Sequence, residues 1–211
     1  HLMPINFFDV SAFVLQELGV EADNREIEAF RFYLHLLDKW NAVYNITSVA
    51  PKSKWVSTHL YDSCSIIKFL PEGSLLDIGT GGGFPGLPIA ILQPKREVVL
   101  LDRSEKKTAF LRQVVIELDI KNVTIITTRL EDYQPLNQFD VIVTRAFSEL
   151  ELFVKNASRL CKPHGRLLAM KGQYPAAELD SLPRSLVMKV TKLKVPSLKA
   201  ERHVVELLPN F

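Results

Sequence analysis

The chain has 211 residues, of which 47% are hydrophobic and 24% are charged, and its net charge is +2. These values allow a hydrophobic core without disulfide support and exclude the disordered, collagen-like and coiled-coil classes. The two cysteines, Cys64 and Cys161, are too few for a disulfide framework, no apolar run reaches the ~18–20 residues of a membrane helix, and the N-terminus lacks a signal-peptide pattern, so we expect a cytoplasmic protein that does not enter a membrane.

Residues 1–70 are predicted to form a small helical extension, in which residues 1–2 resemble the remnant of a tag. Asp23 followed by Glu26 has the spacing of a capping box at the start of a helix. The apolar residues behind this cap recur with helical spacing in two stripes, which are Ile27, Phe30, Leu34 and Leu37, and Tyr33, Leu36 and Trp40. We expect these aromatic side chains to lie in the core. A further helix is predicted over 55–70.

The pattern then changes to short apolar runs separated by helical segments. Five runs are predicted to be strands, at 75–78, 98–101, 123–126, 141–143 and 167–170. Helices predicted over 104–118 and 149–160 lie between them, which is typical of βαβ units and a parallel sheet. Two more strands, 186–195 and 203–208, have no full helix between them and predict an antiparallel hairpin. We therefore predict an α/β core over 71–211 with a mostly parallel seven-stranded sheet and an antiparallel terminal strand.

A glycine-rich turn after the first predicted strand is the most informative segment. It begins at Leu75 and reads LLDIGTGGGFPG. Glycines let the backbone approach a ligand closely, and the carboxyl ends of strands are where nucleotides bind in open α/β sheets. From Gly81, the turn matches the dinucleotide pattern G-x-G-x-x-G, and Asp102 lies 19 residues beyond its second glycine. From Asp77, the same turn reads D-x-G-x-G-x-G and resembles the S-adenosylmethionine motif of Rossmann-like methyltransferases.

Three features favour the methyl donor over a dinucleotide. Asp77 would repel a pyrophosphate but would face the cation of the methyl donor. The terminal hairpin matches the antiparallel strand of a methyltransferase sheet, and too few residues remain for the second domain of a dehydrogenase. Asp102, at the end of the second predicted strand, is expected to accept hydrogen bonds from both ribose hydroxyls. The sequence therefore predicts a Rossmann-like, S-adenosylmethionine-dependent methyltransferase fold.

The class of acceptor can be narrowed by what the sequence lacks. Methylation of carbon 5 of a pyrimidine needs a cysteine nucleophile, but neither Cys64 nor Cys161 follows a proline in a loop at a strand end, so we expect both to be buried. Methyltransferases of exocyclic amines usually carry Asn/Asp-Pro-Pro-aromatic after the fourth strand, where this chain has Thr144–Phe147. An acceptor that is already nucleophilic at neutral pH remains, and guanine N7 is one. Catalysis would then be mostly alignment.

Basic residues gather in two places. Lys106 and Lys107 lie in the first turn of a predicted helix, where they oppose the helix dipole at a cost of ~0.3–1 kcal/mol each. Contact with phosphate would explain them, and simple solvation is the alternative. Residues 151–211 hold 11 basic and 5 acidic residues, a net charge of +6. This segment fits either a polyanion site or a solvated edge.

The sequence resembles the bacterial 16S ribosomal RNA guanine-N7 methyltransferases, also called the glucose-inhibited division protein B family. The segments that carry the resemblance are 39–41 (KWN), 44–48 (YNITS), His59 with Asp62 and Ser63, 77–88, Lys106 and Lys107 with Phe110 and Leu111, 145–147 (RAF), 171–172 (KG) and 202–203 (RH). They span nearly the whole chain. One position departs from the family pattern, because Arg103 follows Asp102 where the family has serine, and we expect it to add a phosphate contact.

The resemblance implies a cytoplasmic enzyme, and we expect it to act as a monomer without a metal. It would use S-adenosylmethionine, release S-adenosylhomocysteine, and methylate N7 of one guanine in the decoding region of 16S rRNA, in the small subunit or an assembly intermediate. The residues expected to bind the cofactor are Asp77, Gly79, Gly81, Phe84, Asp102, Leu130, Glu131 and Arg145. The catalytic residues would be Arg145, which reaches the cofactor or the target base, and Asn45. The expected RNA contacts are His59, Lys106, Lys107, Arg112, Lys171 and Arg202.

The charge change of the reaction limits the surroundings of the site. Methyl transfer moves positive charge from sulfur onto the purine, so a bare cation beside it would oppose the reaction. We therefore predict that Arg145 and Lys171 are neutralised by phosphate, by the cofactor carboxylate or by a protein acid. His59, Asp62 and Ser63 share one helix face, which we expect to order the loop that contains Asn45 rather than to bind a metal.

Two other functions stay open at this point. One is a methyltransferase that acts on a small molecule or a protein, and RNA binding that weakens steeply with salt would argue against it. The other is a dinucleotide-binding or nucleotide-sensing module without catalysis. Binding of S-adenosylhomocysteine and not of NAD would exclude that module.

Overall fold

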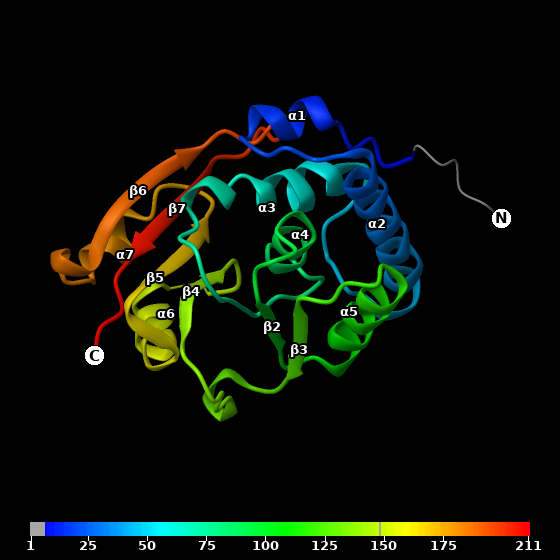
Figure 1. Cartoon of the computed structure of the whole chain (residues 1–211). Coiled ribbons are helices and arrows are strands. Elements are labelled where there is room, and N and C mark those ends of the chain that lie inside the picture. Colours follow the sequence, from blue (N-terminus) through cyan, green and yellow to red (C-terminus); the bar gives the residue numbers. More distant parts are fainter. Residues whose placement is uncertain (1–6, 148) are drawn as a thin grey trace.

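The computed structural model describes residues 7–147 and 149–211, and a seven-stranded sheet forms their centre (Figure 1). Its strands are β1 (Leu75–Ile78), β2 (Val98–Asp102), β3 (Val123–Thr127), β4 (Phe139–Thr144), β5 (Cys161–Lys171), β6 (Val187–Leu193) and β7 (Arg202–Leu207). Their order is β3-β2-β1-β4-β5-β7-β6, and β7 pairs antiparallel with both of its neighbours. The predicted mostly parallel sheet is confirmed, although the antiparallel strand lies inside the sheet and β6 forms its edge.

Seven α-helices surround this sheet in the described residues. They are α1 (Ala12–Glu17), α2 (Asn24–Tyr44), α3 (Asp62–Cys64), α4 (Gly86–Leu92), α5 (Glu105–Glu117), α6 (Leu150–Ala157) and α7 (Ala176–Asp180). The capping box predicted at the start of α2 is confirmed, because Asp23 accepts a hydrogen bond from the Glu26 amide and Glu26 accepts one from the Asp23 amide. None of the helices in this part of the chain is both long and apolar enough to cross a membrane.

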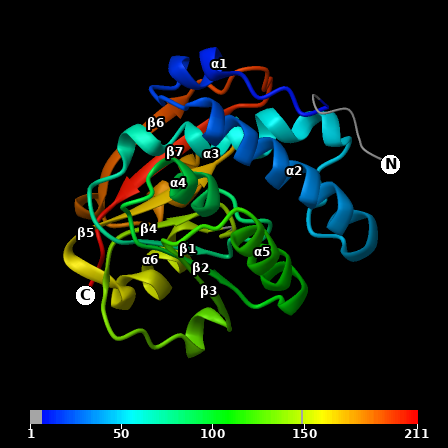
Figure 2. The ribbon, with the colours of Figure 1, turned by 45° about the vertical axis from the view of Figure 1, so that its right-hand side comes forward.

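Two layers of apolar side chains cover the two faces of the sheet. Because successive residues of a strand point to opposite faces, Leu75 belongs to one layer and Leu76 to the other. The first layer includes the apolar residues of α2, α4 and α5, and α2 packs against both of these helices (Figure 2). The second layer includes those of α6. The boundary proposed at residue 70 therefore separates a helical segment from an α/β segment, and both segments contribute side chains to the first layer.

The prediction of a single regular helix over 55–70 is wrong in detail. The structure has a π-helical turn over Val56–Tyr61, then the short α3 and a 3₁₀ turn over Ile67–Phe69. Wide turns of this kind occur often where side chains must be redirected. Here the side chains of His59 and Asp62 both contact Arg145 on another element. The tag remnant expected at residues 1–2 lies outside the described residues.

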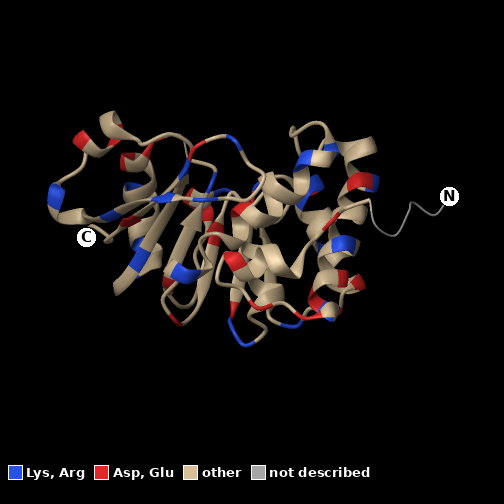
Figure 3. Cartoon of the chain, turned by 90° about the horizontal axis from the view of Figure 1, so that it is seen from above, with Lys and Arg blue, Asp and Glu red and all other residues tan. Residues whose placement is uncertain are grey.

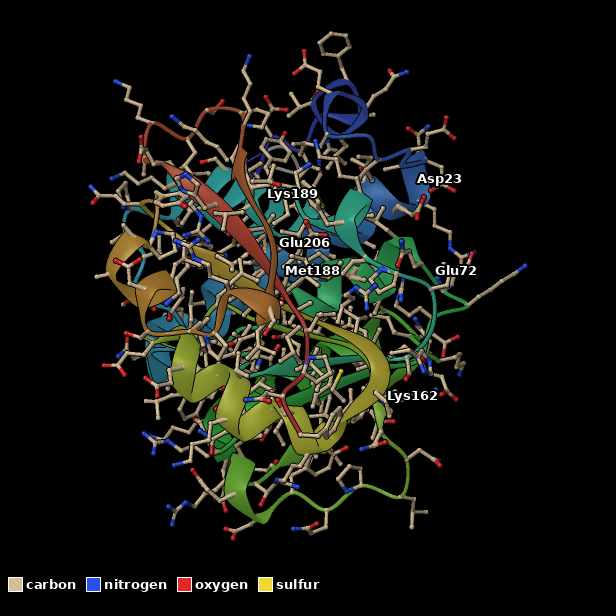
Figure 4. All side chains as sticks on the ribbon, turned by 90° about the vertical axis from the view of Figure 1, so that its left-hand side faces the viewer. Asp23, Glu72, Lys162, Met188, Lys189 and Glu206 are labelled. Carbon is tan, nitrogen blue, oxygen red and sulfur yellow. The ribbon has the colours of Figure 1, made fainter. Side chains whose placement is uncertain are left out.

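The basic residues of the last third of the chain lie on several elements, among them β5, β6 and β7. Figure 3 shows Lys and Arg dispersed over the ribbon among Asp and Glu. Several of them pair with acids, in the pairs Lys162–Asp140, Lys171–Glu178, Lys192–Glu201 and Arg202–Asp62. Figure 4 shows Lys189 of β6 and Glu206 of β7, which are register partners on adjacent strands. Asp140 and Asp62 lie outside residues 151–211, so their pairs with Lys162 and Arg202 balance part of the net charge of +6.

Candidate active site

The glycine-rich turn joins the end of β1 to the start of α4. Asp77 is fully buried, and its Oδ2 accepts hydrogen bonds from Thr80 Oγ1 and from the Gly86 amide, both at 2.8 Å. These bonds tie the two ends of the turn to one carboxylate. Burial raises the pKa of Asp77 to about 7, because the lowering effects of these two bonds and of the Arg145 charge offset only part of the desolvation.

Two glycines of this turn combine a positive φ with no room for a side chain. Gly79 has φ of +67°, and a Cβ there would lie 2.6 Å from the Cβ of Ala146. Gly83 has φ of +101°, and a Cβ there would lie 2.4 Å from the hydroxyl of Tyr33. The turn is therefore held between α2 and the segment after β4, in a backbone conformation that favours glycine.

Asp102 connects the turn to α5. Its Oδ2 accepts a hydrogen bond from the Gly81 amide at 2.8 Å, and its Oδ1 accepts one from the Ser104 amide at 2.9 Å. Ser104, and not Asp102, caps α5 through its hydroxyl. A carboxylate has about four acceptor positions, so Asp102 keeps capacity for ligand hydroxyls.

A cavity of about 520 Å³ opens at this carboxyl edge of the sheet. Five of the residues predicted to bind the cofactor line it, namely Gly79, Gly81, Asp102, Leu130 and Glu131. Sequence reasoning missed further lining residues, which are Ile78, Leu101, Thr128, Arg129, Ala146, Phe147 and Asn156. Most of these lie at or just after strand ends, and that position is the signal that could have identified them. The role of the five predicted residues in cofactor binding stays a prediction.

Phe84 does not line this cavity. Its side chain is 3% exposed, and its ring stacks between the rings of His59, with centroids 4.5 Å apart, and Tyr33, with centroids 5.1 Å apart. Tyr33 donates a hydrogen bond to the carbonyl of Gly82. The aromatic residue of the turn therefore packs in the core and fixes the turn against α2 and the π-helical turn.

Arg145, just after β4, lies in a network of protein acceptors. It donates to the carbonyl of Thr58 at 3.0 Å, to Asp62 Oδ2 at 2.8 Å and to His59 Nδ1 at 3.2 Å. Its guanidinium carbon lies 5.8 Å from the centre of the Phe84 ring. Three of its five N–H donors are thus directed to the protein.

The other predicted cations of this edge are also paired. Arg202 donates to both oxygens of Asp62, from Nε at 2.6 Å and from Nη2 at 3.0 Å. Lys171 lies 2.8 Å from Glu178 and donates to the carbonyl of Phe147. A protein acid pairs with each of the two cations that were predicted to be neutralised, Arg145 and Lys171. Lys171 has Glu178 as its partner, whereas Arg145 shares the single charge of Asp62 with Arg202, so its charge is balanced only in part.

His59 is a neutral imidazole in this arrangement. A guanidinium can only donate, so His59 Nδ1 accepts from Arg145, and Nε2 carries the proton and donates to Thr47 Oγ1 at 2.9 Å. Burial, and then the charge of Arg145, lower the pKa of His59 to about 3. The polar helix face thus orders the loop after Asn45, as predicted. Asn45 itself ends α2 with φ of 48° and is exposed outside the cavity wall.

The basic residues at the start of α5 differ from those around Asp62. Lys107 and Arg103 line the cavity, and Lys106 lies 5.8 Å from the centre of the Tyr44 ring. Within residues 7–147 and 149–211, no carboxylate forms an ion pair with any of these three cations. Arg112, further along α5, donates to a threonine hydroxyl of β3 at 3.0 Å. Of the predicted RNA contacts, Lys106 and Lys107 are therefore the most available to phosphate.

Neither cysteine is placed as a nucleophile. Cys64 and Cys161 are both fully buried, as expected, and burial raises the pKa of each thiol, that of Cys161 to about 11. In the described part of the chain, no group of three His, Cys, Asp or Glu side chains is placed to hold a metal ion.

The residues around the cavity fit the methyl donor that the glycine motif predicts. Gly81 has open space where a Cβ would lie, so the turn leaves room for a ligand. Asp77 is not among the lining residues of the cavity, but its Oδ1 is buried without a hydrogen-bond partner among the described residues, which leaves a carboxylate oxygen unsatisfied behind the turn. Asp102 can accept ribose hydroxyls, while Leu130, Leu101 and Phe147 offer apolar surface for a purine.

This sheet order, with its antiparallel β7 and its glycine turn after β1, is that of the Rossmann-like methyltransferases. A S-adenosylmethionine-dependent methyltransferase from Aquifex aeolicus superposes with a TM-score of 0.55 at 21% identity, over 74% of this chain and 93% of that one. The family described as rRNA small subunit methyltransferase G (GidB) matches residues 26–205. Ribosomal RNA small subunit methyltransferase G of Nitrosococcus oceani is 46% identical over 92% of this chain and 91% of its own length. The protein of the same name from Chromobacterium violaceum is 46% identical over 92% and 94%. The chain therefore belongs to the rRNA small subunit methyltransferase G family.

Proposed function

We propose that this protein transfers a methyl group from S-adenosylmethionine to N7 of a guanine in 16S rRNA. The family match over 26–205 supports an activity on small-subunit rRNA. The observation that carries the choice of atom is the lack of the groups that other acceptors need: both cysteines are buried, and Thr144–Phe147 stands where methyltransferases of exocyclic amines carry Asn/Asp-Pro-Pro-aromatic. The His59 ring is also occupied, because it accepts from Arg145 and donates to Thr47. Guanine N7 has a lone pair at neutral pH and needs no proton removed.

The donor would lie along the carboxyl edge of β1 and β2. When bound, S-adenosylmethionine supplies an electrophilic methyl group on a positively charged sulfur. Asp102 would accept the ribose hydroxyls, Leu130 and Glu131 would hold the adenine, and Gly79 and Gly81 would allow the backbone to approach. Asp77 would stabilise the cation from behind the turn, because a buried negative charge acts strongly over short distances.

The paired cations suit this reaction. As the methyl group moves, positive charge develops on the purine, and unpaired guanidinium groups would repel it. Asp62 carries part of this balance for Arg145 and Arg202, and Glu178 carries it for Lys171. The chain's own residues would therefore orient the guanine with part of this positive charge balanced, so alignment would provide most of the rate acceleration.

The substrate would be 16S rRNA in the small subunit or an assembly intermediate, and the enzyme would act as a cytoplasmic monomer. The test is transfer of a labelled methyl group to small subunits from a strain that lacks this enzyme, followed by strand cleavage at N7-methylguanine. Labelled N7 of one guanine is the expected product. Label on another atom would contradict the choice of N7, and label only on a small molecule or a protein would contradict the RNA substrate.

A further inference from the structure

The polar residues of the π-helical turn and α3 contact Arg145 and Arg202, and the proposed chemistry so far uses them only to balance charge. The side chain of Asp62 is 1% exposed and pairs with two guanidinium groups. Arg145 follows β4, and Arg202 lies at the start of β7. These two side chains are 22% and 19% exposed, so they extend from the buried carboxylate toward the solvent side of the carboxyl edge.

Hydrogen-bond chemistry fixes the direction of every contact in this cluster. Arg145 donates to Asp62 and His59, and His59 donates in turn to Thr47 of the loop after α2. Thr47 also accepts from the amide of Val49. The chain of contacts runs from this loop to Arg145 and on through Asp62 to Arg202, and reversal of any link would place two donors face to face.

We propose that Asp62 and His59 are positioning residues, which hold Arg145 and Arg202 as one fixed unit for the methyl transfer. This inference rests on the proposed function, because it assigns Arg145 to that reaction. Asp62 would have two effects on the two arginines. The carboxylate orients the guanidinium groups, and it also removes one positive charge that would attract RNA but oppose the transfer.

The decisive variant is Asp62→Asn, which keeps the shape and removes the charge. In single-turnover reactions with saturating donor and subunits, we expect a rate about tenfold to a hundredfold lower, the loss typical of misplaced groups. We expect RNA affinity to stay the same or to rise, because the site gains positive charge. A merely structural role would weaken rate, donor binding and RNA binding together.

A mutant cycle tests whether Asp62 acts through the two arginines. In a background with both Arg145→Ala and Arg202→Ala, Asp62→Asn should change the rate by less than about twofold. If it slows that variant by the factor seen in the unmodified protein, the inference is wrong. Asp140→Asn is the matched control, since Asp140 is also a paired carboxylate of this fold but lies at the opposite edge of the sheet, beside Lys162. It should leave the rate unchanged.

Thr47→Val provides a second test that leaves the buried carboxylate in place. It breaks the far link of the chain at a part-buried site, so we expect a smaller loss of rate, about threefold to tenfold, with unchanged donor binding. An unchanged rate would show that the contact between His59 and Thr47 does not help to position Arg145, and His59 would not be a positioning residue. Failure of the proposed function is distinct from both outcomes, because the unmodified protein would then methylate no guanine N7.

Discussion

Two groups of cations lie at the carboxyl edge of the sheet, and they differ in whether they form ion pairs with protein acids. We call the first group the paired cations, which are Arg145, Lys171 and Arg202. We call the second group the open cations, which are Arg103, Lys106 and Lys107 at the start of α5. The paired cations come from three separate elements and meet buried or half-buried acids. The open cations are neighbours in sequence and meet no acid among the described residues.

This difference teaches which cations belong to the geometry of the site and which are available to a polyanion. A charge that is taken out of water costs several kcal/mol unless a partner and hydrogen bonds compensate, so the paired cations are fixed in place. The open cations keep their hydration and can exchange it for phosphate. RNA binding and methyl transfer should therefore respond to different substitutions.

The largest expected effect comes from removal of the shared carboxylate. Asp62→Ala leaves two guanidinium groups without their acid, so we expect the free energy of unfolding to fall by about 3–5 kcal/mol. Urea unfolding followed by circular dichroism measures this change. A loss below about 1 kcal/mol would show that solvent, and not Asp62, balances the two arginines.

Substitution of the open cations should have the opposite profile. Lys106→Gln with Lys107→Gln should weaken RNA binding severalfold and reduce the slope of log affinity against log salt by about 0.7 for each lysine, while stability stays within ~0.5 kcal/mol. Titrations at several salt concentrations measure the slope. Lys189→Gln on the outer edge strand is the matched control (Figure 4) and should leave the slope unchanged. An unchanged slope in the double variant would show that Lys106 and Lys107 do not contact RNA phosphate.

Asp77 differs from Asp62, because it is a buried carboxylate that forms no ion pair with a basic side chain of the described residues. Its pKa is raised from 3.8 to about 7, so the ligand-free folded state binds the proton more tightly than the unfolded chain does. The free energy of unfolding should therefore fall as the pH rises from about 4 to 7, and this contribution is fully present only below the unfolded pKa.

The same ionisation should control binding of the donor. Below pH 7, affinity for S-adenosylmethionine should rise with pH by up to tenfold per unit, because only ionised Asp77 attracts the sulfonium. S-adenosylhomocysteine lacks this charge and should show a much weaker dependence. Calorimetry with both ligands from pH 5.5 to 8.5 measures the difference, and Asp77→Asn should abolish it. Equal slopes for the two ligands would contradict the placement of Asp77 opposite the cation.

The smallest effect is expected at Arg112. Its guanidinium donates to Thr127 within the fold, so Arg112→Gln should change RNA affinity less than about twofold and stability by less than ~1 kcal/mol. Binding measured beside the Lys106 and Lys107 variants tests this. A loss as large as theirs would restore Arg112 to the RNA-contacting residues.

The order of elements and the location of the site could be predicted because their signals are local. The capping box at Asp23, the strand–helix alternation and the glycine turn each depend on neighbouring residues. The paired cations could not be assigned, because Arg145 and Arg202 lie 83 and 140 residues from Asp62. The place of Phe84 was missed for the same reason, since its stacking partners come from two distant helical segments.

The position of β7 has a consequence for the synthesis of the protein. Ribosomes make β6 before β7, yet β7 lies between β5 and β6, so β6 has no neighbour to pair with until Arg202–Leu207 has been made. Arg202 also reaches Asp62 only at that moment. The nascent chain therefore lacks Arg202 until residue 202 has been made, and the contact of both arginines with Asp62 can form only after that.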